Sequence, residues 1–323
     1  MLTYSIVIRT LGTSGEMFRE ELLSIARQSV KPDKVLIYIA EGYAQPFDKI
    51  GEEEYVWVRK GMAAQRLLAY DDISSDVIFF LDDDVVLATD SAERMLEAME
   101  EHAAECVAAD TFRNHRMNAA QKLYAAVTNL VFPHRGSNWA FKVHANGSFS
   151  YCNNPREPFL LSQKFDGPAF MVRKNVYDAL DYKSELWLDD LGFAFGDDWV
   201  ISYKLYSNGY KMGVLYDAGC EHRSAATSSG QYRRSNTRFY TRTKAQFIIW
   251  WRTIYSPATS KFKKVMAALS FAVKTVWLFG VFMLMSIVRF SPRFIMQFVR
   301  GTIDGWRYVH TSAFKGVSSF IVK

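Results

Sequence analysis

The stretch that decides the fold is VIFFLDDDVVL, residues Val77 to Leu87. A run of mostly large apolar side chains leads into Asp82, Asp83 and Asp84, and a shorter apolar run follows. The first run is typical of a buried β-strand, because continuous apolar residues fit a strand that is covered on both faces. Three adjacent carboxylates at the end of such a strand repel one another unless a cation lies nearby. The triplet therefore marks a candidate site.

The segments around this strand alternate between strand-like and helix-like patterns. The predicted strands are YSIVIRT (4–10) and DKVLIYIAEG (33–42), and the predicted helices are EMFREELLSIARQSV (16–30), GMAAQRLLAYDDI (61–73) and SAERMLEAMEEHA (91–103). Such alternation predicts an α/β fold with a Rossmann-like, mainly parallel sheet and helices on both faces. Ligands of these folds bind at the carboxyl ends of the strands, which is where the acidic triplet lies.

The second half of the chain is less regular at first. Residues 110–163 contain Asn, Pro, Gly and aromatic clusters, which predict loops and short strands over a site. Regular patterns return as a strand with a short helix (167–180), a helix ended by glycine (197–209) and a strand (210–219). The small, polar stretch RSAATSSGQYRR (223–234) predicts a mobile loop.

The C-terminal part of the chain differs in charge and hydropathy. The 323 residues carry a net charge of +5, but Asp304 is the only acid after Arg223, so the last third is strongly basic. Residues 265–288 hold a single charged side chain, Lys274, and basic residues flank them. Since a membrane-spanning helix needs ~20 apolar residues, this length is borderline. Basic flanks fit a helix that lies in an anionic membrane surface at least as well. A buried core helix is the alternative.

The cysteines and the N-terminal sequence indicate the cellular compartment in which the protein acts. Cys106, Cys152 and Cys220 are odd in number and have no metal-binding spacing, so we expect a reducing compartment without disulfides. The N-terminus lacks the pattern of a signal peptide and is interpreted as the first strand. We therefore expect the cytoplasmic face of the cell (inner) membrane, with peripheral or monotopic attachment, although a single transmembrane helix also fits.

Two further acidic or basic features accompany the triplet. In an extended strand Asp82 and Asp84 would point to one side, where Mg²⁺ or Mn²⁺ would relieve their repulsion; a solvated strand end is the alternative. Asp197 and Asp198 directly precede a predicted helix, where one carboxylate serves as a cap and the other is available as a general base. His222 follows a strand expected to end at the same edge, so it is either a third metal ligand or a structural histidine.

Taken in order, these motifs resemble the family 2 glycosyltransferases with the GT-A fold. The resemblance covers roughly residues 1–223 and rests on the first strand, KGMAAQR (60–66), FLDDDVVL (80–87), GPAFMVRK (167–174) and FGDDWVISYKLYSNGYK (195–211). It implies that the triplet is the family's DxD-type site, with Asp82, Asp84 and His222 as metal ligands. It also implies that the second acidic pair contains the catalytic base, Asp198 in preference to Asp197. The nucleotide-sugar residues implied in this way are Arg9, Thr10, Glu41, Gln65, Arg66, Asp82, Asp83, Asp166 and Gly167.

The chain departs from the family's pattern at two places. The first strand ends in Arg9 and Thr10, where the family usually has a Pro-Thr-type turn, and the acidic pair is Asp-Asp where the family has Glu-Asp. The resemblance divides the chain into a GT-A catalytic domain (1–225), a basic loop or helical linking region (226–260) and a membrane-associating helical segment (261–323).

The expected activity is an inverting, metal-dependent hexosyl- or deoxyhexosyltransferase. A nucleotide diphosphate sugar would be the donor and a hydroxyl of a lipid-linked saccharide the acceptor, in cell-surface polysaccharide synthesis, with no nucleic acid partner. A sugar nucleotidyltransferase is one alternative, but RTLGTSGE (9–16) is a poor match to a glycine-rich phosphate loop. A membrane-attached saccharide-binding protein with a degenerate site is the other, and the intact acidic set argues against it.

Overall fold

A mixed eight-stranded sheet forms the centre of the protein. The structure is a computed structural model that describes residues 2–111, 117–134, 138–192, 196–223 and 237–322. The strand order is β10-β12-β6-β11-β4-β1-β2-β3. The strands are β1 (Tyr4–Thr10), β2 (Val35–Ala40), β3 (Glu54–Val58), β4 (Val77–Asp82), β6 (Cys106–Ala109), β10 (Phe159–Leu161), β11 (Ala169–Arg173) and β12 (Met212–Leu215). Only β10 and β11 run against the other strands of this sheet, so the expected mainly parallel sheet is confirmed.

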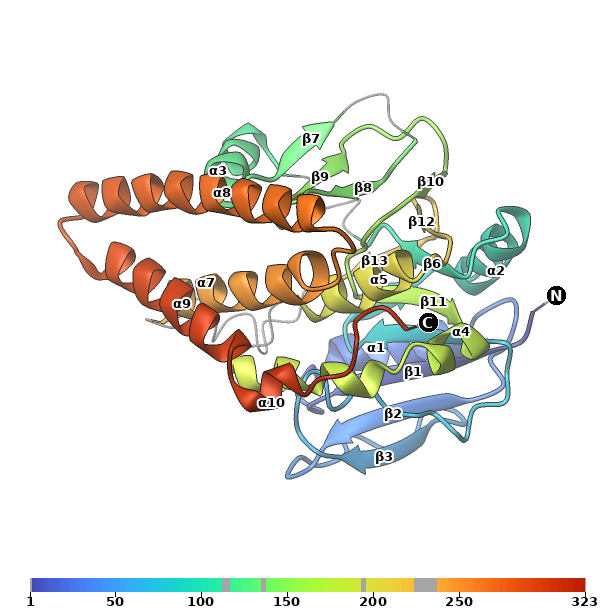
Figure 1. Cartoon of the computed structure of the whole chain (residues 1–323). Helices are drawn as coiled ribbons and strands as arrows, with labels where there is room; N and C mark the ends of the chain where they lie inside the picture. The colour runs from blue at the N-terminus through green and yellow to red at the C-terminus, as the bar shows by residue number, and fades with distance from the viewer. Residues whose placement is uncertain (1, 112–116, 135–137, 193–195, 224–236, 323) are drawn as a thin grey trace.

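Helices cover both faces of the sheet, as the alternation predicted (Figure 1). One face carries α1 (Glu16–Ala26) and α2 (Ser91–Glu101), and the other carries α4 (Lys174–Ala179), the 3₁₀ helix η2 (Tyr182–Leu191) and α5 (Asp197–Ser207). Side chains of β4 alternate between the two layers. Phe79 and Leu81 belong to the apolar cluster with α1 and α2, and Ile78 and Phe80 belong to the opposite cluster. The strand is apolar throughout because both of its faces are buried.

Two small sheets lie at the carboxyl ends of the large one. The strand β5 (Val85–Leu87), which follows the acidic triplet, pairs with β13 (Cys220–His222), and this register places His222 opposite Val85. The other sheet contains β7 (Phe132–His134), β8 (Phe141–Val143) and β9 (Phe149–Cys152). The helix α3 (Ala119–Asn129) lies where loops and short strands were expected, and it begins with a reciprocal capping box between Asn118 and Gln121.

The helix predicted over 61–73 is wrong. These residues form turns, and Tyr70 adopts a left-handed backbone with φ of 52°. The apolar periodicity of the segment arises from burial of Leu67 and Ile73 in the core. The amide groups of Ala63 and Ala64 donate to the Asp189 carboxylate at 2.8 and 3.0 Å. Such a contact also suits the start of a helix, whose first amides have no partner within the helix. The segment departs from helical geometry further along, at Tyr70.

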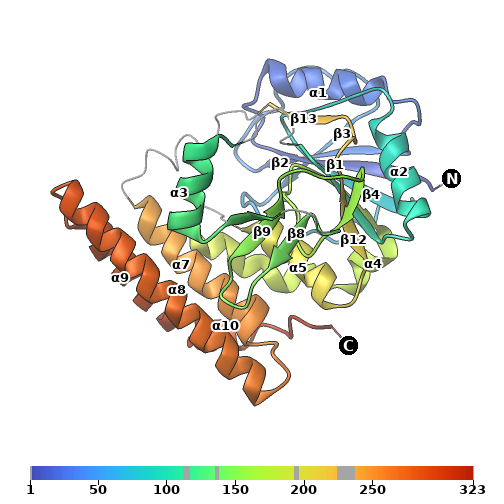
Figure 2. The same cartoon turned by 90° about the horizontal axis from the view of Figure 1, so that it is seen from above.

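The C-terminal helices are α7 (Arg238–Trp250), the π-helical turn η3 (Trp251–Tyr255), α8 (Lys261–Val288), α9 (Arg293–Val309) and α10 (Ser312–Lys315). The hairpin of α8 and α9 projects beyond the sheet body, and α7 runs between it and the body (Figures 1 and 2). An aromatic and aliphatic cluster joins the three helices: Phe239, Leu278, Phe282, Phe294 and Phe298. The tail then returns to the body, where Phe314 and Phe320 enter the main core.

Among the described residues, α8 is the one helix that is long and apolar enough to cross a membrane. Only 22% of its most apolar window is buried within the protein, so the alternative of a buried core helix is wrong. The loop predicted over 223–234 falls almost entirely on residues 224–236, outside the described part of the chain.

Candidate active site

A cavity of about 600 Å³ lies at the carboxyl ends of β1 and β4. It brings together seven of the predicted site residues: Arg9, Arg66, Asp82, Asp166, Gly167, Asp197 and Asp198. Residues of α3 and α7, among them Asn129 and Trp250, complete its walls. The other predicted residues do not line this cavity: Thr10, Glu41, Gln65, Asp83, Asp84 and His222. The carboxylates from the two sequence motifs therefore meet across one space, although they are more than a hundred residues apart in the chain.

Two arginines neutralise one aspartate of each motif. Arg9 Nε lies 2.9 Å from Asp82 Oδ1, and Arg9 Nη1 lies 3.0 Å from Asp197 Oδ2. Arg66, which is 2% exposed, makes the same two ion pairs, with Nη1 at 3.0 Å from Asp197 Oδ2 and Nη2 bonded to Asp82 Oδ1. Burial opposes ionisation of Asp82, but the two guanidinium groups hold its pKa below the ordinary value. The protein itself thus supplies part of the positive charge that the triplet requires.

The rest of the triplet lies in a turn. Since β4 ends at Asp82, the prediction that Asp82 and Asp84 share one face of an extended strand is wrong. Asp83 accepts hydrogen bonds from the hydroxyls of Thr10 and Ser14, at 2.5 and 2.8 Å. Burial raises the pKa of Asp83 to about 6, although these two donors oppose the shift.

Asp84 faces the histidine that the sequence singled out. Its Oδ1 atom lies 3.1 Å from His222 Nε2, and the backbone amide of Arg223 donates to its carbonyl oxygen at 2.8 Å. Burial alone would lower the pKa of His222, but the hydrogen bond to Asp84 and the surrounding acidic charges raise it. The pairing of β5 with β13 is what brings the two side chains together.

Glu21 lies beneath the triplet and was not recognised in the sequence. Its side chain is fully buried on α1, and its Oε2 atom accepts the amide of Val85 at 3.4 Å. Burial and the charges of the three aspartates raise its pKa well above the ordinary value, which favours the protonated carboxylic acid. Its place in an amphipathic helix gave no indication of this contact.

The donor chemistry of the site fits a divalent cation only in part. The described residues contain no ready-made group of three or more His, Cys, Asp or Glu side chains that would hold a metal. Asp84 and His222 nevertheless offer an oxygen and a nitrogen side by side, and Asp82 lines the cavity. Mg²⁺ bound with phosphates takes only one or two carboxylates from the protein. The prediction that Asp82, Asp84 and His222 would hold Mn²⁺ or Mg²⁺, together with substrate oxygens, therefore stays a prediction.

Asp198 differs from its neighbour Asp197. It lies in the first turn of α5, and its Oδ1 atom accepts the backbone amide of Trp199 at 2.8 Å. Within the described ranges, no salt bridge includes Asp198. Burial raises its pKa to about 6; Lys164 lowers it, and the charges of Asp197 and Asp166 raise it further. A carboxylate that is desolvated and poorly compensated is a better proton acceptor than one held by two arginines.

The loop before β11 brings the backbone of Gly167 close to Asp198. A side chain at Gly167 would approach both Arg66 Nη1 and Asp198 Cβ to 3.0 Å, so a larger residue there would displace one of them. The preceding Asp166 pairs with Lys164 at 2.8 Å. Lys164 is 3% exposed and lies over the rings of Phe141 and Phe149, at 4.3 and 4.4 Å from their centroids. No sequence pattern indicated Lys164, because its influence on Asp198 joins residues that are far apart in the chain.

Two predicted nucleotide residues lie outside the cavity. Gln65 is buried, and its Nε2 atom donates to the carbonyl oxygens of Thr10 and Tyr38, at 2.9 and 3.0 Å. It thereby ties the ends of β1 and β2 together. Glu41 is exposed in the turn after β2. Their roles in nucleotide binding stay predictions.

Comparison with known proteins gives the fold and a family likeness. The profile of the family described as "Glycosyl transferase family 2" matches residues 38–159. A crystal structure of S. aureus TarS, residues 1–349 in complex with UDP-GlcNAc, has a TM-score of 0.55 and 13% identity, and the match covers 95% of this chain and 82% of that chain. A crystal structure of GalNAc-T7 with UDP, GalNAc and Mn²⁺ has a TM-score of 0.49 and 12% identity, with coverage of 69% of this chain and 44% of that chain.

The likeness to TarS confirms the GT-A fold class, whereas the likeness to GalNAc-T7, less than half of which this chain spans, is too distant to add to it. The family profile bears out the resemblance to the family 2 glycosyltransferases. No curated protein sequence matches this chain.

Proposed function

With a GT-A fold and a segment like glycosyl transferase family 2 as the premise, we propose that this protein is an inverting glycosyltransferase. It moves a sugar from a nucleotide diphosphate sugar to a hydroxyl of a lipid-linked saccharide, at the cytoplasmic face of a membrane, in cell-surface polysaccharide synthesis. The transferred sugar is a hexose or a deoxyhexose.

The position and raised pKa of the Asp198 carboxylate are the main support for the proposal. Its carboxylate lines the cavity, has a pKa raised to about 6 by burial, and lies beside Asp197, whose charge two arginines already balance. A general base works best when its pKa lies close to the pH of the reaction. Asp198 removes the proton of the acceptor hydroxyl as that oxygen attacks the anomeric carbon from the face opposite the leaving diphosphate. The configuration at that carbon is therefore inverted.

The remaining charged residues hold the donor. Arg9 and Arg66 fix Asp82 and Asp197 at the edge of the cavity, so that the carboxylates do not rearrange when phosphate enters. A divalent cation, when bound by Asp82, Asp84 and His222, supplies positive charge for the leaving diphosphate. Preorganised charge of this kind lowers the barrier because it needs no reorientation during the reaction.

The exposed apolar face of α8 supports a membrane surface as the place of action. Side chains such as Val273, Val276 and Val288 are between 64% and 72% exposed, and Phe290 at the tip of the hairpin is 95% exposed. Contiguous apolar surface of this kind is uncommon on soluble monomers. Basic residues flank it: Lys261, Lys263, Lys264, Arg289 and Arg293. An anionic bilayer provides both an apolar phase and negative charge, so α8 would lie within the interface.

The experiment for the activity is release of nucleotide diphosphate from a panel of nucleotide sugars, with and without Mn²⁺. We expect one donor to be hydrolysed in the presence of metal. Release of pyrophosphate from a nucleoside triphosphate and a sugar phosphate would instead show a nucleotidyltransferase. Absence of any turnover, with saccharide binding retained, would leave the binding-protein alternative.

The experiment for location is cosedimentation of the full chain with vesicles of phosphatidylcholine alone or mixed with phosphatidylserine. We expect binding to the anionic vesicles and weaker binding of a Phe290→Glu, Val276→Glu variant. A chain that stays in the supernatant with both vesicles contradicts the membrane assignment.

A further inference from the structure

A second cavity of about 300 Å³ adjoins the first. Four residues line both spaces, Met117, Val131, Phe149 and Asp166, so no more than a single layer of side chains separates the two cavities. Nothing in the proposed reaction uses the second cavity. Its volume is about half that of the first, and it lies within the described residues.

The sheet topology fixes where the second cavity lies. Its floor is formed by the residues at the carboxyl ends of β6 and β12, which are neighbouring parallel strands. The first cavity lies at the ends of β1 and β4, and β11 separates the two strand pairs. Since β11 begins just after Asp166 and Gly167, the loop before it forms the border between the two cavities. A ligand that crosses this border passes the side of Asp166, with Asp198 in the first cavity.

The lining combines aromatic faces with hydrogen-bonding groups. The aromatic residues are Phe141, Phe149, Tyr151 and Tyr216, and the polar ones are Asp110, Thr111, Lys122, Asn153 and Asp166. Aromatic rings pack against the apolar faces of a neutral ring, while amide, hydroxyl, ammonium and carboxylate groups exchange hydrogen bonds with its edge. A sugar ring presents both kinds of surface. A purely apolar ligand would use the aromatic faces but not the polar side chains of this lining.

Thr111 provides an independent observation. Its side chain is 2% exposed, and its Oγ1 atom has no hydrogen-bond partner in the part of the chain that the structure describes. Its backbone is held, because its amide donates to Ala109 at 3.0 Å and its carbonyl accepts from His222 at 3.4 Å. Buried hydroxyls normally have a partner. Thr111 lines this cavity, so rotation of its side chain about the Cα–Cβ bond would let a ligand hydroxyl placed there supply the missing partner.

We propose that the second cavity is a saccharide subsite for the penultimate sugar of the acceptor. The terminal sugar then lies in the first cavity, with its hydroxyl at Asp198, and the next unit occupies the space above β6 and β12. The substrate class is accordingly an acceptor of at least two neutral sugar units, not a monosaccharide. This inference rests on the proposed glycosyl transfer, but the subsite can be examined by binding alone.

The test uses the full chain and matched pairs of methyl glycosides. Each pair consists of a monosaccharide and the corresponding disaccharide of glucose, galactose, mannose or N-acetylglucosamine, and saturation-transfer NMR gives the Kd of each. We expect at least one disaccharide to bind about tenfold more tightly than its monosaccharide. In Thr111→Val this preference should fall about fivefold, which is the fold-change for one lost hydrogen bond.

Two further variants keep the test decisive. Asn153→Ala removes a second polar group of the cavity and replaces Thr111→Val if that chain fails to fold. Thr302→Val makes the same chemical change on α9, where the hydroxyl only donates to Phe298 at 2.9 Å, and should leave the preference unaltered. Equal affinities within every pair, binding by no member at millimolar concentration, or a preference unchanged in both cavity variants overturns the subsite. Donor hydrolysis by the unaltered chain decides the proposed function separately, since it requires no acceptor.

Discussion

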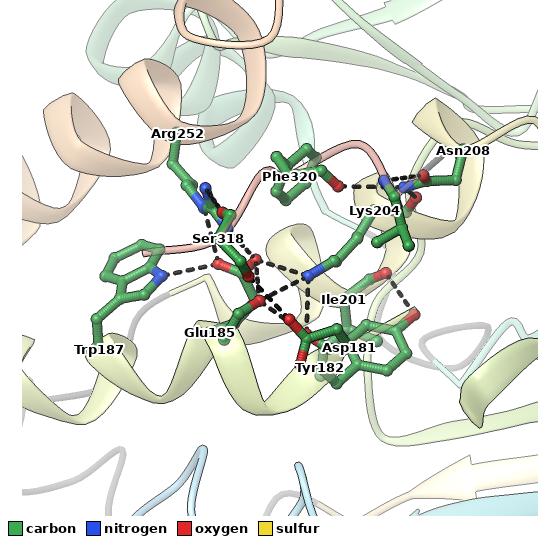
Figure 3. Close-up of polar contacts among 12 residues, drawn as sticks. Asp181, Tyr182, Glu185, Trp187, Ile201, Lys204, Asn208, Arg252, Ser318 and Phe320 are labelled. Carbon is green, nitrogen blue, oxygen red and sulfur yellow. Dashed lines mark hydrogen bonds and ion pairs between the residues drawn. The ribbon is translucent and has the colours of Figure 1, made fainter. Parts of the chain in front are cut away.

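Two buried carboxylates, Glu185 and Asp198, lie in opposite electrostatic surroundings. The Oε1 atom of Glu185 is 2.9 Å from Lys204 Nζ and 2.6 Å from Arg252 Nη2, and its Oε2 atom accepts from Arg252 Nε at 3.0 Å and from Trp187 Nε1 at 2.7 Å (Figure 3). Burial opposes its ionisation, but Arg252 and Lys204 hold its pKa below the ordinary value. Asp198 has no such cation partner in the described structure, and burial raises its pKa to about 6.

The difference separates a charge that stabilises the fold from the carboxylate that we propose as the base. Glu185 lies on η2, Lys204 on α5 and Arg252 on η3, and Arg252 also donates to the carbonyl of Ser318 at 2.8 Å (Figure 3). The cluster therefore fastens the C-terminal helices and the tail to α5, the helix whose first turn carries Asp198. Full pairing makes this junction stable, whereas incomplete pairing leaves Asp198 able to accept a proton.

The largest expected effect is loss of transfer in Asp198→Asn. Removal of a general base lowers turnover by ~10²- to 10⁴-fold. Donor binding should persist, because the arginines and the acidic triplet are unchanged. Transfer rates and donor Kd values of this variant and of Asp197→Asn provide the comparison. A dead Asp197→Asn beside an active Asp198→Asn would show that the wrong carboxylate has been assigned.

The same substitution should raise the free energy of unfolding at pH 7. The folded pKa of Asp198, about 6, lies above the ordinary value of ~3.9 in an unfolded chain. The stability linked to this group is thus present below pH ~4 and is lost as the pH rises through about 6. Asparagine does not ionise, so the variant does not lose this free energy of unfolding as the pH rises. Urea unfolding of both chains at pH 7 measures the difference, and a destabilised Asp198→Asn would contradict it.

Glu185→Ala should have the opposite effect on stability. It leaves Lys204 and Arg252 buried without their carboxylate, and breaking a buried ion pair costs about 3–5 kcal/mol. The matched control is Asp178→Ala, which removes a partly exposed partner of Lys174 and should cost at most about 1 kcal/mol. Denaturant unfolding of both variants measures the two losses. Similar losses would mean that the buried cluster is not the junction inferred from its contacts.

Asp84→Ala should weaken metal-dependent activity while the fold survives. Loss of a ligand at the Asp84–His222 pair is expected to raise the Mn²⁺ concentration for half-maximal turnover by at least ~10-fold. Turnover over a Mn²⁺ series measures this shift, with Asp178→Ala as the surface control. Unchanged metal dependence would remove Asp84 from the set of ligands.

The smallest expected effect is a shift in the pH profile. Because Asp198 must be ionised, transfer should rise with pH through about 6 and then level off. Lys164 lowers the pKa of Asp198, so Lys164→Met should move the rising limb to higher pH. Rates between pH 5 and 8 measure the limb, and a shift toward lower pH would contradict the assigned influence of Lys164.

Much of the α/β fold could be predicted from the sequence, because local patterns specify it. The apolar run before Asp82 identifies a strand buried on both faces, and the glycine at 209 follows the end of α5. The helix expected over 61–73 does not form, because Tyr70 takes a left-handed backbone conformation and tertiary contacts bury Leu67 and Ile73. Local periodicity does not reveal such a contact.

Long-range contacts in the candidate site were likewise not predictable from the sequence. The sequence identified Asp82, Asp197 and Asp198, but it did not show that Arg9 and Arg66 bind the first two and leave the third without a salt bridge among the described residues. These pairs join residues up to 188 positions apart.

The tail also depends on long-range packing. A chain that ends at Tyr255 would lose Phe314 and Phe320 from the core and the carbonyl of Ser318 from Arg252. We therefore expect such a truncation to destabilise the whole protein, and substitutions on the exposed face of α8 are the cleaner test of membrane binding.

The most direct measurement of the contrast between the two carboxylates is a carboxyl ¹³C NMR titration of the full chain, with Asp198→Asn and Glu185→Gln used to assign the two signals. We predict a midpoint of about 6 for Asp198 and a midpoint below the ordinary glutamate value for Glu185. An Asp198 midpoint at or below ~4, the ordinary value for aspartate, would contradict its role as the under-compensated base.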